Sequence, residues 1–295
     1  MLPAIRRPTP FDISRLFFVG AIWGSVFIFI AIALTEFQPV SIAAWRVFLA
    51  AIVLVVIVFL TRRKFPRTIW EWRYVFIVGC LNSAIPFFLI SWGQQFISSA
   101  ETALLMAVGT FCALIVSHFT SVDERINPSR AIGVSVGFIG VLVLVLWDMM
   151  DTGLGGIKGQ IAVILAGCSY AISSVISRRL SHLSTISTSA ATMLSASLYM
   201  VPLAFLLGNP IPAHVSLASM ASVIYLGVVA TALAVTLRFT IIRANGAVFM
   251  SQVGYLVPLF GVIWSGLYFA DAINLQTILS LSLILAGIAI TRKGN

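Results

Sequence analysis

Polar side chains inside otherwise apolar segments are the residues of this sequence that could do chemistry. Asn82 and Ser83 stand within one such segment, and Gln252 and Tyr255 stand within another. An unpaired amide in hydrocarbon is costly, so these groups should face water, a solute or one another. Their chemistry suits the binding of a small organic molecule, with hydrogen bonding between helices as the alternative.

Aromatic side chains occupy comparable positions. Trp23, Trp92, Tyr170 and Tyr255 could surround an organic molecule with ring faces and polar edges. The alternative is a place in the aromatic belts of a membrane interface. Together with hydroxyls, amides and one adaptable apolar side chain, the predicted lining of a solute site is Trp23, Ser25, Asn82, Ser83, Trp92, Met106, Tyr170, Ser173, Gln252 and Tyr255.

Arg46 is the charge placed deepest in an apolar segment, about 9 Å from its nearer end at roughly 1.5 Å per residue. An unpaired guanidinium at that depth is costly, so an internal partner is expected. Glu101, near the same end of another segment, is the predicted partner. The alternative is that Arg46 recognises a carboxylate of a substrate.

Pro86 and Pro258 follow the polar residues of their segments. Each proline removes a backbone donor and is expected to kink its helix. Both are candidates for bending during a conformational change, although static kinks are also common.

The composition places these residues in a membrane protein. The chain has 295 residues, 60% of them hydrophobic and only 9% charged, with a mean hydropathy of +1.07. About a quarter of the residues of a soluble domain are charged. The formal charge of +9 therefore indicates membrane topology, and no nucleic-acid partner is expected. Cys80, Cys112 and Cys168 lie in apolar segments, so a disulfide framework is not expected.

Apolar runs long enough to cross a bilayer predict an all-α integral membrane protein with ten transmembrane helices. No alternation of the kind needed for a barrel is present. The predicted helices are 16–34, 40–60, 72–92, 99–119, 129–147, 160–180, 185–207, 217–241, 246–270 and 273–291.

The loops between these helices separate by charge. One side carries 16 of the 18 Lys and Arg residues, from Arg6, Arg7 and Arg15 through Arg125 to Lys293, whereas the other side has Lys158 alone. Basic loops stay in the cytoplasm. Both termini are therefore predicted to be cytoplasmic, which requires an even number of helices.

Two related halves are indicated by an internal match. A shift of about 147 residues brings Trp23 onto Tyr170, Gly140 onto Gly287, and Ser99-Ala100 onto Gly246-Ala247. Because five helices per half is an odd number, the halves must be inverted in the membrane. We expect a first repeat over 1–147, a periplasmic connector over 148–159 and a second repeat over 160–295. The connector is predicted to be a solvated turn.

Glycines on the fifth and tenth helices indicate close packing. Gly133, Gly137 and Gly140 share one helix, and Gly287 lies on the other. Small residues let membrane helices approach each other. They predict a scaffold or a dimer face, so a monomer and a homodimer both stay open.

The sequence lacks the motifs of enzymes and ATP-driven pumps. It has no GxxxxGK[ST] loop, no HExxH, no GxSxG and no cysteine–histidine spacing for zinc. No enzyme activity, cofactor or metal is therefore expected. No carboxylate lies near the middle of a predicted helix, which favours facilitated transport over proton coupling, with titration of Glu101 or His118 as the alternative.

Several segments resemble the EamA-type repeats of the drug/metabolite transporter superfamily. The first repeat is similar over WGSVF from Trp23, PVSIAAWRVFLAA from Pro39, SSAETALLMAVG from Ser98, VDERINPSRAIG from Val122 and GFIGVLVLV from Gly137. The second is similar over the long run from Ala244 and over LAGIAI from Leu285. The two repeats differ at one position of the match, where the first repeat has Phe111 and the second has Pro258.

Within the superfamily the chain looks closest to ten-helix amino-acid exporters of the YddG type. The resemblance implies a bacterial inner membrane, a cavity between inverted halves and alternating access. It implies export of amino acids or aromatic compounds. Because no Lys lies in a predicted helix and Arg46 is the only deep cation, a phosphorylated ligand would be poorly compensated, so small neutral or zwitterionic metabolites are expected first, amino acids including aromatic ones foremost. Efflux of aromatic or cationic drugs, and a membrane scaffold or lipid carrier without transport, are the alternatives.

Overall fold

The computed structural model describes residues 8–120, 127–269 and 274–293, and every regular element in these ranges is helical. Eight helical segments are long and apolar enough to cross a membrane, and two shorter apolar helices follow near the C-terminus. The predicted all-α fold with ten spans is therefore confirmed. Arg6, Arg7 and Arg125, part of the predicted charge asymmetry, lie outside the described residues.

Several spans consist of more than one helical element. The elements are α1 (Pro10–Ala33), α2 (Pro39–Leu60), α3 (Ile69–Gly79), η1 (Cys80–Ala84), α4 (Ile85–Gly93), α5 (Ser99–Leu105), α6 (Val108–Thr120), α7 (Pro128–Thr152), η2 (Gly153–Gly155), α8 (Ile157–Ser177), η3 (Arg178–Leu180), α9 (Thr185–Leu207), α10 (Leu217–Ile224), η4 (Tyr225–Leu233), α11 (Ala234–Met250), α12 (Val253–Phe269) and α13 (Leu275–Lys293).

Capping residues explain why two helices begin earlier than hydropathy predicts. Thr9 caps α1, where its hydroxyl accepts from the backbone of Asp12 and the Asp12 carboxylate accepts from the backbone of Thr9. Thr68 and Glu71 form the same capping box at the start of α3. Each box satisfies backbone donors that have no partner inside the helix. Hydropathy alone excludes these polar residues, so it places the helix starts too late.

The third span of each half contains a π-helical stretch. Residues 80–84 form η1 in the first half, and their counterparts at the 147-residue shift, residues 227–231, lie inside η4 in the second half. Pro86 is the second residue of α4, which begins where η1 ends. Because proline has no backbone N–H, a carbonyl one turn earlier has no donor in the regular helical pattern. Single π-helical turns often occur at functional sites.

The fourth span of each half is broken near its start. α5 ends at Leu105, and the next regular helix starts at Val108 after the turn at Met106-Ala107. In the second half, α11 has a non-helical Gly246 with φ 87°, and Ser251-Gln252 forms a turn before α12. The ninth helix therefore begins regularly at Val253, later than predicted, and Gln252 lies in a turn.

The connector between the halves corrects the predicted loop. α7 continues to Thr152, and α8 begins at Ile157, so most of the segment from Trp147 to Gly159 is helical. Only the short η2 and Gly156 separate the two helices. The acids and glycines of the segment from Trp147 to Gly159 indicated a turn. Such residues are also compatible with a helix end that extends beyond the hydrocarbon, where they can contact water.

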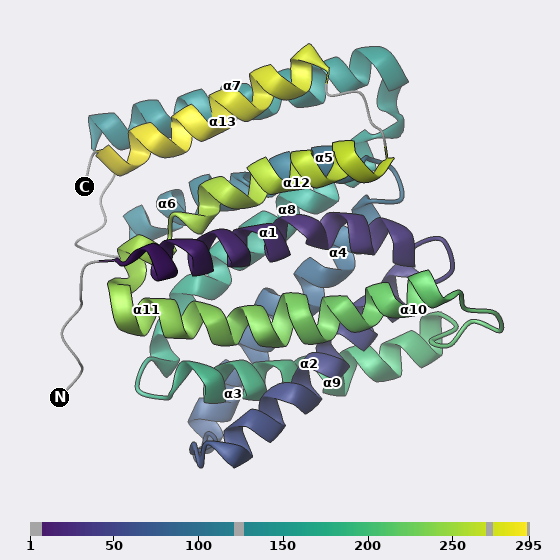
Figure 1. The fold of residues 1–295 in the computed structure, drawn as a ribbon, viewed down its shortest axis with the longest axis vertical. Helices are drawn as coiled ribbons and strands as arrows, with labels where there is room; N and C mark the ends of the chain where they lie inside the picture. Colours follow the sequence, from purple (N-terminus) through teal and green to yellow (C-terminus); the bar gives the residue numbers. More distant parts are fainter. Residues whose placement is uncertain (1–7, 121–126, 270–273, 294–295) are drawn as a thin grey trace.

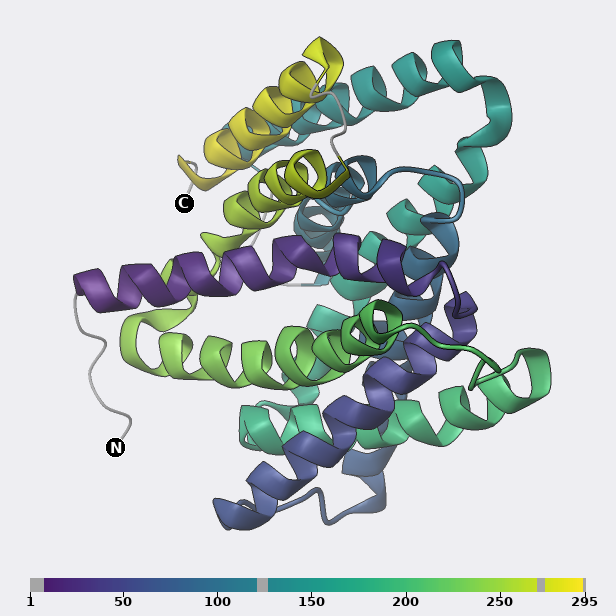
Figure 2. The same cartoon turned by 45° about the vertical axis from the view of Figure 1, so that its right-hand side comes forward.

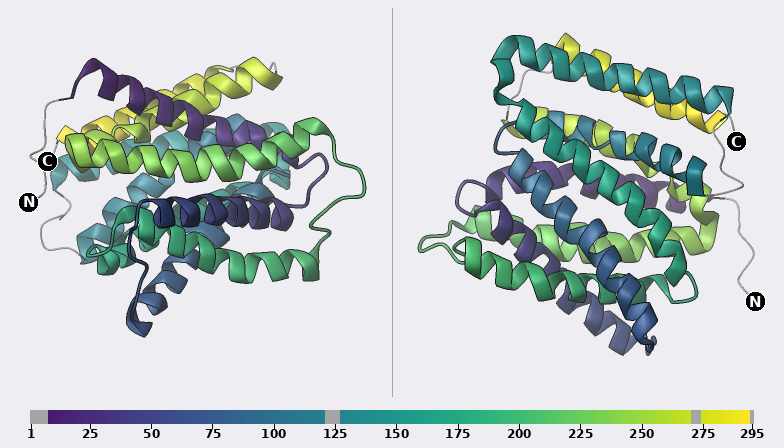
Figure 3. Two further views of the ribbon diagram at one scale, coloured as in Figure 1. Left: turned by 60° about the horizontal axis from the view of Figure 1, so that its bottom comes forward. Right: turned by 180° about the vertical axis from the view of Figure 1, so that it is seen from behind.

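The helices stack in layers, with α7 and α13 side by side at one edge (Figure 1). Figure 2 and the right-hand view of Figure 3 show the same pair at one edge of the bundle. α2 and α9, the second helices of the two halves, also pack against each other. α1 begins and α13 ends on the same side of the bundle (Figure 1), as an even number of spans requires.

Glycines allow the close approach of α7 and α13. A Cβ atom on Gly287 would lie 2.6 Å from the carbonyl oxygen of Gly133 and 2.7 Å from the Cα atom of Gly137. A Cβ atom on Gly140 would lie 2.9 Å from that of Leu283. The predicted glycine face is thus a contact within one chain. Gly133 and Gly140 are covered by α13 and Gly137 is covered by the Phe111 ring, so these glycines are not free to form a dimer face.

We predict that Gly287→Val separates α7 from α13 and destabilises the protein by about 1–3 kcal/mol, because backbone atoms cannot yield to the new side chain. The measurement is the thermal unfolding midpoint in detergent. Gly155→Ala is the matched control, since a Cβ atom at Gly155 meets nothing within 4 Å. Equal midpoints for both variants would contradict the packing described.

Candidate functional site

A cavity of about 320 Å³ lies between the two halves. This volume is at the lower end of the range for small-molecule sites, about 300–1,000 Å³. Helices α7 and α13 contribute nothing to it. Its lining is Trp23, Val26, Phe27, Arg46, Asn82, Phe87, Ile90, Ala103, Met106, Ala107, Thr110, Tyr170, Met193, Ala230, Thr231, Val235, Arg238, Gly254, Val257 and Pro258.

The lining reflects the internal repeat. Four pairs of lining residues are separated by the same 147 positions, so equivalent places in both halves face the same space. A cavity on the axis that relates inverted halves is lined in this way. The pairs are Trp23 with Tyr170, Arg46 with Met193, Ala107 with Gly254, and Thr110 with Val257.

Each π-helical stretch accepts a hydrogen bond from the first helix of the opposite half. Trp23 on α1 donates its indole N–H to the carbonyl of Ala230 in η4, at 3.1 Å. Ser169 on α8 donates its hydroxyl to the carbonyl of Leu81 in η1, at 2.7 Å. Both bonds cross between the halves and end beside the cavity. They fix the positions of Trp23 and of Tyr170, which follows Ser169.

Arg46 is held in the cavity wall by η4. It exposes 7% of its surface, and its Nε donates to the hydroxyl oxygen of Thr231 at 3.0 Å. Its guanidinium carbon lies 3.7 Å from the centre of the Phe87 ring. Thr231 in turn donates to the carbonyl of Leu226 at 2.8 Å. The cation thus rests on an aromatic face and one hydroxyl.

Glu101 does not pair with Arg46, which corrects the prediction. Gln160 on α8 donates its amide N–H to Glu101 at 2.7 Å and to Asp148 at 2.9 Å. This cluster joins α5, α7 and α8. The sequence places both charges toward the same side of the membrane, but hydropathy does not determine the direction in which a side chain leaves its helix, so a shared side did not produce a contact.

Four of the ten predicted lining residues line the cavity: Trp23, Asn82, Met106 and Tyr170. Asn82 belongs to η1 and Met106 to the turn after α5, so both local breaks bring polar or flexible groups to the site. Pro258, predicted as a kink, also lines the cavity from within α12.

The other six lie outside the lining. Ser25 forms a 2.7 Å hydrogen bond with the hydroxyl of Tyr225, and Trp92 packs edge-to-face on Phe96. Tyr255 packs against the apolar cluster around Phe111.

The serines and the glutamine are in different surroundings. Ser83 and Ser173 are buried, and their hydroxyls have no hydrogen-bond partner among the described residues. Gln252 is exposed in the turn before α12. Amides predicted to face a central site can therefore lie in a turn when the helix is broken.

Arg238 is the functional candidate that sequence reasoning missed. Its position near the end of a predicted helix assigned it to the basic loops. α11 instead continues to the kink at Gly246, about 12 Å further at 1.5 Å per residue, so Arg238 lies well inside the span. Thr110 and Thr231 were missed as well, because a lone threonine in a helix usually bonds to its own backbone.

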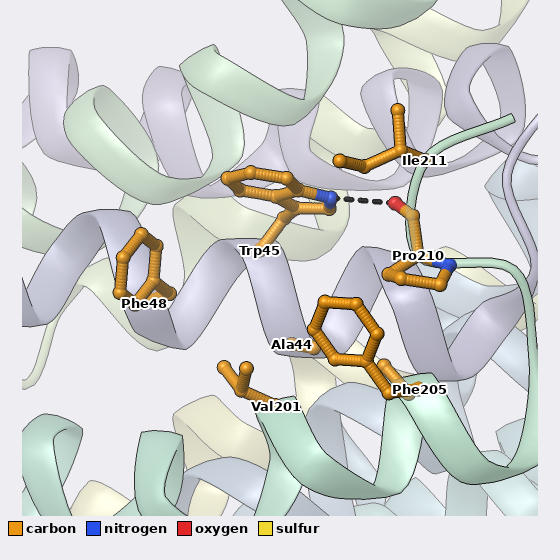
Figure 4. A pocket seen from close by; sticks show the side chains of 8 residues that line it. Ala44, Trp45, Phe48, Val201, Phe205, Pro210 and Ile211 are labelled. Carbon is orange, nitrogen blue, oxygen red and sulfur yellow. Dashed lines mark hydrogen bonds between the residues drawn. The ribbon is translucent and has the colours of Figure 1, made fainter.

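A second pocket, of about 190 Å³, lies between α2 and α9 and is shown in Figure 4. Its lining is almost wholly apolar, with Trp45, Phe48, Val201 and Phe205 among its side chains. The indole N–H of Trp45 donates to the carbonyl of Pro210 at 2.8 Å and is therefore occupied. This pocket offers no charged side chain to a solute, so the cavity between the halves is the candidate site.

Metal binding has no support in the described part of the chain, where no group of three or more His, Cys, Asp or Glu residues comes together.

Comparison with known proteins gives matches along nearly the whole chain. The model of the EamA-like transporter family matches twice, over residues 13–146 and 157–292, on either side of the connector. Among similar proteins is the uncharacterized transporter YoaV of Bacillus subtilis, 22% identical over 92% of each chain. The inner membrane transporter YedA of Escherichia coli is 22% identical over 85% of this chain and 80% of its own.

The fold also has a counterpart of known structure. One crystal structure aligns with a TM-score of 0.71 over 95% of this chain and 97% of the other, at 18% identity. Such a likeness shows the fold alone.

We predict that Thr231→Val lowers the thermal unfolding midpoint, because it leaves the Arg46 Nε without its acceptor at a cost of about 1–3 kcal/mol. Thr236→Val is the matched control, since Thr236 donates only to the carbonyl of Ala232, four residues earlier in the same span. The midpoints of both variants are compared in the same detergent. A Thr231→Val protein as stable as the control would show that Arg46 does not depend on this hydroxyl.

Proposed function

Because the chain belongs to the EamA-like transporter family, we propose that it exports small organic metabolites through the cavity between its halves. The observation that carries the proposal is the lining of this cavity by equivalent residues of both repeats. A site on the axis between inverted repeats can be exposed to either side of the membrane by related movements. Alternating access is the mechanism that follows.

The lining chemistry favours metabolites with a carboxylate, and amino acids are our first candidates. The guanidinium of Arg46 can bind a carboxylate, and Asn82 and Thr110 supply hydrogen-bonding groups. The faces of Trp23 and Tyr170 can bind an ammonium group or an aromatic side chain. The cavity would hold roughly ten water molecules at about 30 Å³ each, which suits a small metabolite.

The proposed location is a bacterial inner membrane with both termini in the cytoplasm. Its support is the concentration of basic residues on one side of the predicted helices. The start of α1 and the end of α13 lie on the same side of the bundle, which is compatible with both termini in one compartment (Figure 1).

Efflux of cationic drugs is less well supported than metabolite export. Two arginines line the cavity, and no acidic side chain is among the described lining residues. Like charges brought together in a partly dry site repel each other. A scaffold without transport is also less well supported, because a scaffold would not need a polar cavity on the axis between the repeats.

We predict that purified protein in liposomes accelerates the movement of labelled amino acids. A panel of acidic, neutral, aromatic and basic amino acids is measured with and without a pH gradient, against protein-free liposomes. Facilitated transport predicts rates that respond to the solute gradient and not to the pH gradient. If no member moves faster than in protein-free liposomes, amino-acid export is contradicted.

Movement between the halves is tested by cross-linking. The sulfur atoms of Cys112 on α6 and Cys168 on α8 lie 3.0 Å apart, and α6 and α8 belong to different halves. A disulfide needs the sulfurs about 1 Å closer. We predict that a mild oxidant joins them and stops transport in the same liposomes, and that a thiol reductant restores it.

The control for cross-linking is Cys112→Ser, which removes one sulfur of the close pair and should resist the oxidant. Mass spectrometry counts the joined pairs. Undiminished transport by the fully joined protein would mean that α6 and α8 do not separate during the cycle.

A further inference from the structure

We propose that the cavity selects organic anions, and that Arg46 and Arg238 bind the anionic groups of the substrate. The inference rests on the proposed function and narrows its substrate class from metabolites with a carboxylate to those with a net negative charge, with acidic amino acids and dicarboxylates foremost. It is carried by two guanidinium groups in one cavity wall and by the absence of acidic partners for either among the described residues.

Arg46 is a buried cation without a counter-ion. A guanidinium has five N–H donors, and the described structure gives Arg46 one acceptor, the hydroxyl of Thr231. The Phe87 ring covers one face of the group. A charge in this setting is costly unless an anion or water completes its hydrogen bonds. Since Arg46 lines the cavity, an anion there can do so.

Arg238 lies on the same helical face as the residue that holds Arg46. Thr231 and Arg238 are seven residues apart, which is close to two turns and about 10 Å along the helix axis. Arg238 lines the cavity with an exposed side chain, and it forms no ion pair or hydrogen bond with any residue in the described ranges. Two cations therefore lie at different depths along one passage.

The described acidic side chains of the spans are engaged elsewhere. Glu101 and Asp148 share the amide of Gln160, Asp12 caps the start of α1, and Glu71 caps α3 and contacts His182. None of these four lines the cavity. Neither arginine is neutralised by them, so the site carries a positive potential that attracts anions and repels cations.

Trp23 and Tyr170 offer a binding place for an amino group of the substrate. Trp23 and Tyr170 line the same cavity, and their ring faces can accept an ammonium group without any carboxylate. An acidic amino acid then has a place for each of its charges, and a dicarboxylate has a place for both of its anionic groups. A basic amino acid places its second positive charge near the arginines.

The test uses matched probes on the whole protein in liposomes. Glutamate and glutamine differ only by the replacement of one carboxylate by an amide, glutarate lacks the amino group, and lysine carries the opposite charge. Initial rates are compared at equal concentrations. We expect glutamate and glutarate to exceed glutamine by about tenfold, equivalent to ~1.4 kcal/mol, and lysine to be carried least.

Variants assign the selectivity to the two arginines. Arg238→Gln should remove most of the advantage of glutamate over glutamine, because the exposed side chain can change without disturbing the fold. Arg243→Gln is the matched control, since Arg243 is exposed on the same helix and outside the cavity lining. Arg46→Gln should abolish the stabilisation of the purified protein by glutarate, measured as a shift of its unfolding midpoint.

The outcomes separate this inference from the proposed function. Glutamine or lysine carried as fast as glutamate would overturn the choice of anions and leave metabolite export standing. Stabilisation by glutarate that depends on both arginines, without transport of any probe, would support the anion site and overturn the transport proposal. A protein that neither binds nor carries the two acids would overturn the inference.

Discussion

Hydrocarbon offers no hydrogen-bond partners, and this constraint governs how the polar groups of the chain are arranged. Each buried polar group must be satisfied by another part of the protein or by something in a cavity. The amide group of Gln160 donates to the carboxyl groups of Glu101 and Asp148. The hydroxyl of Thr231 accepts from Arg46 and donates to a backbone carbonyl. The hydroxyls of Ser83 and Ser173 are exceptions among the described residues. Arg46 is another, because it has one acceptor for its five N–H donors and lines the cavity between the halves.

The same constraint explains where the helices are irregular. A π-helical stretch or a broken turn releases backbone groups from the regular ladder, which is tolerated in a membrane only beside other protein or a cavity. Both irregularities occur in equivalent spans of the two halves, and the carbonyls of Leu81 and Ala230 there accept bonds from the opposite half. Irregular backbone, contact between halves and cavity therefore coincide.

Hydropathy predicted the ten spans, because the free energy of burying apolar side chains is summed over a whole segment. It could not predict features set by single bonds. The capping boxes at Thr9 and Thr68 lengthen helices beyond their apolar runs, and continuation of α11 to Gly246 brings Arg238 inside. Trp23, Asn82 and Tyr170 were predicted correctly because polar or aromatic side chains in the middle of a span must face a cavity or a neighbouring helix. The prediction for Gln252 was wrong because the turn at Ser251-Gln252 interrupts the helix, and residues on either side of a break no longer share a helical face.

The pairing of Arg46 with Met193 at equivalent positions of α2 and α9 bears on how such a chain arose. If the ancestor was a single half that assembled as an antiparallel dimer, every substitution appeared twice around the axis. Two arginines would then have met across the contact of these helices. Fusion of two gene copies removes this restriction, because each half can mutate alone. In this chain Met193 stands at the position equivalent to Arg46, so the contact of these helices carries one cation and not two.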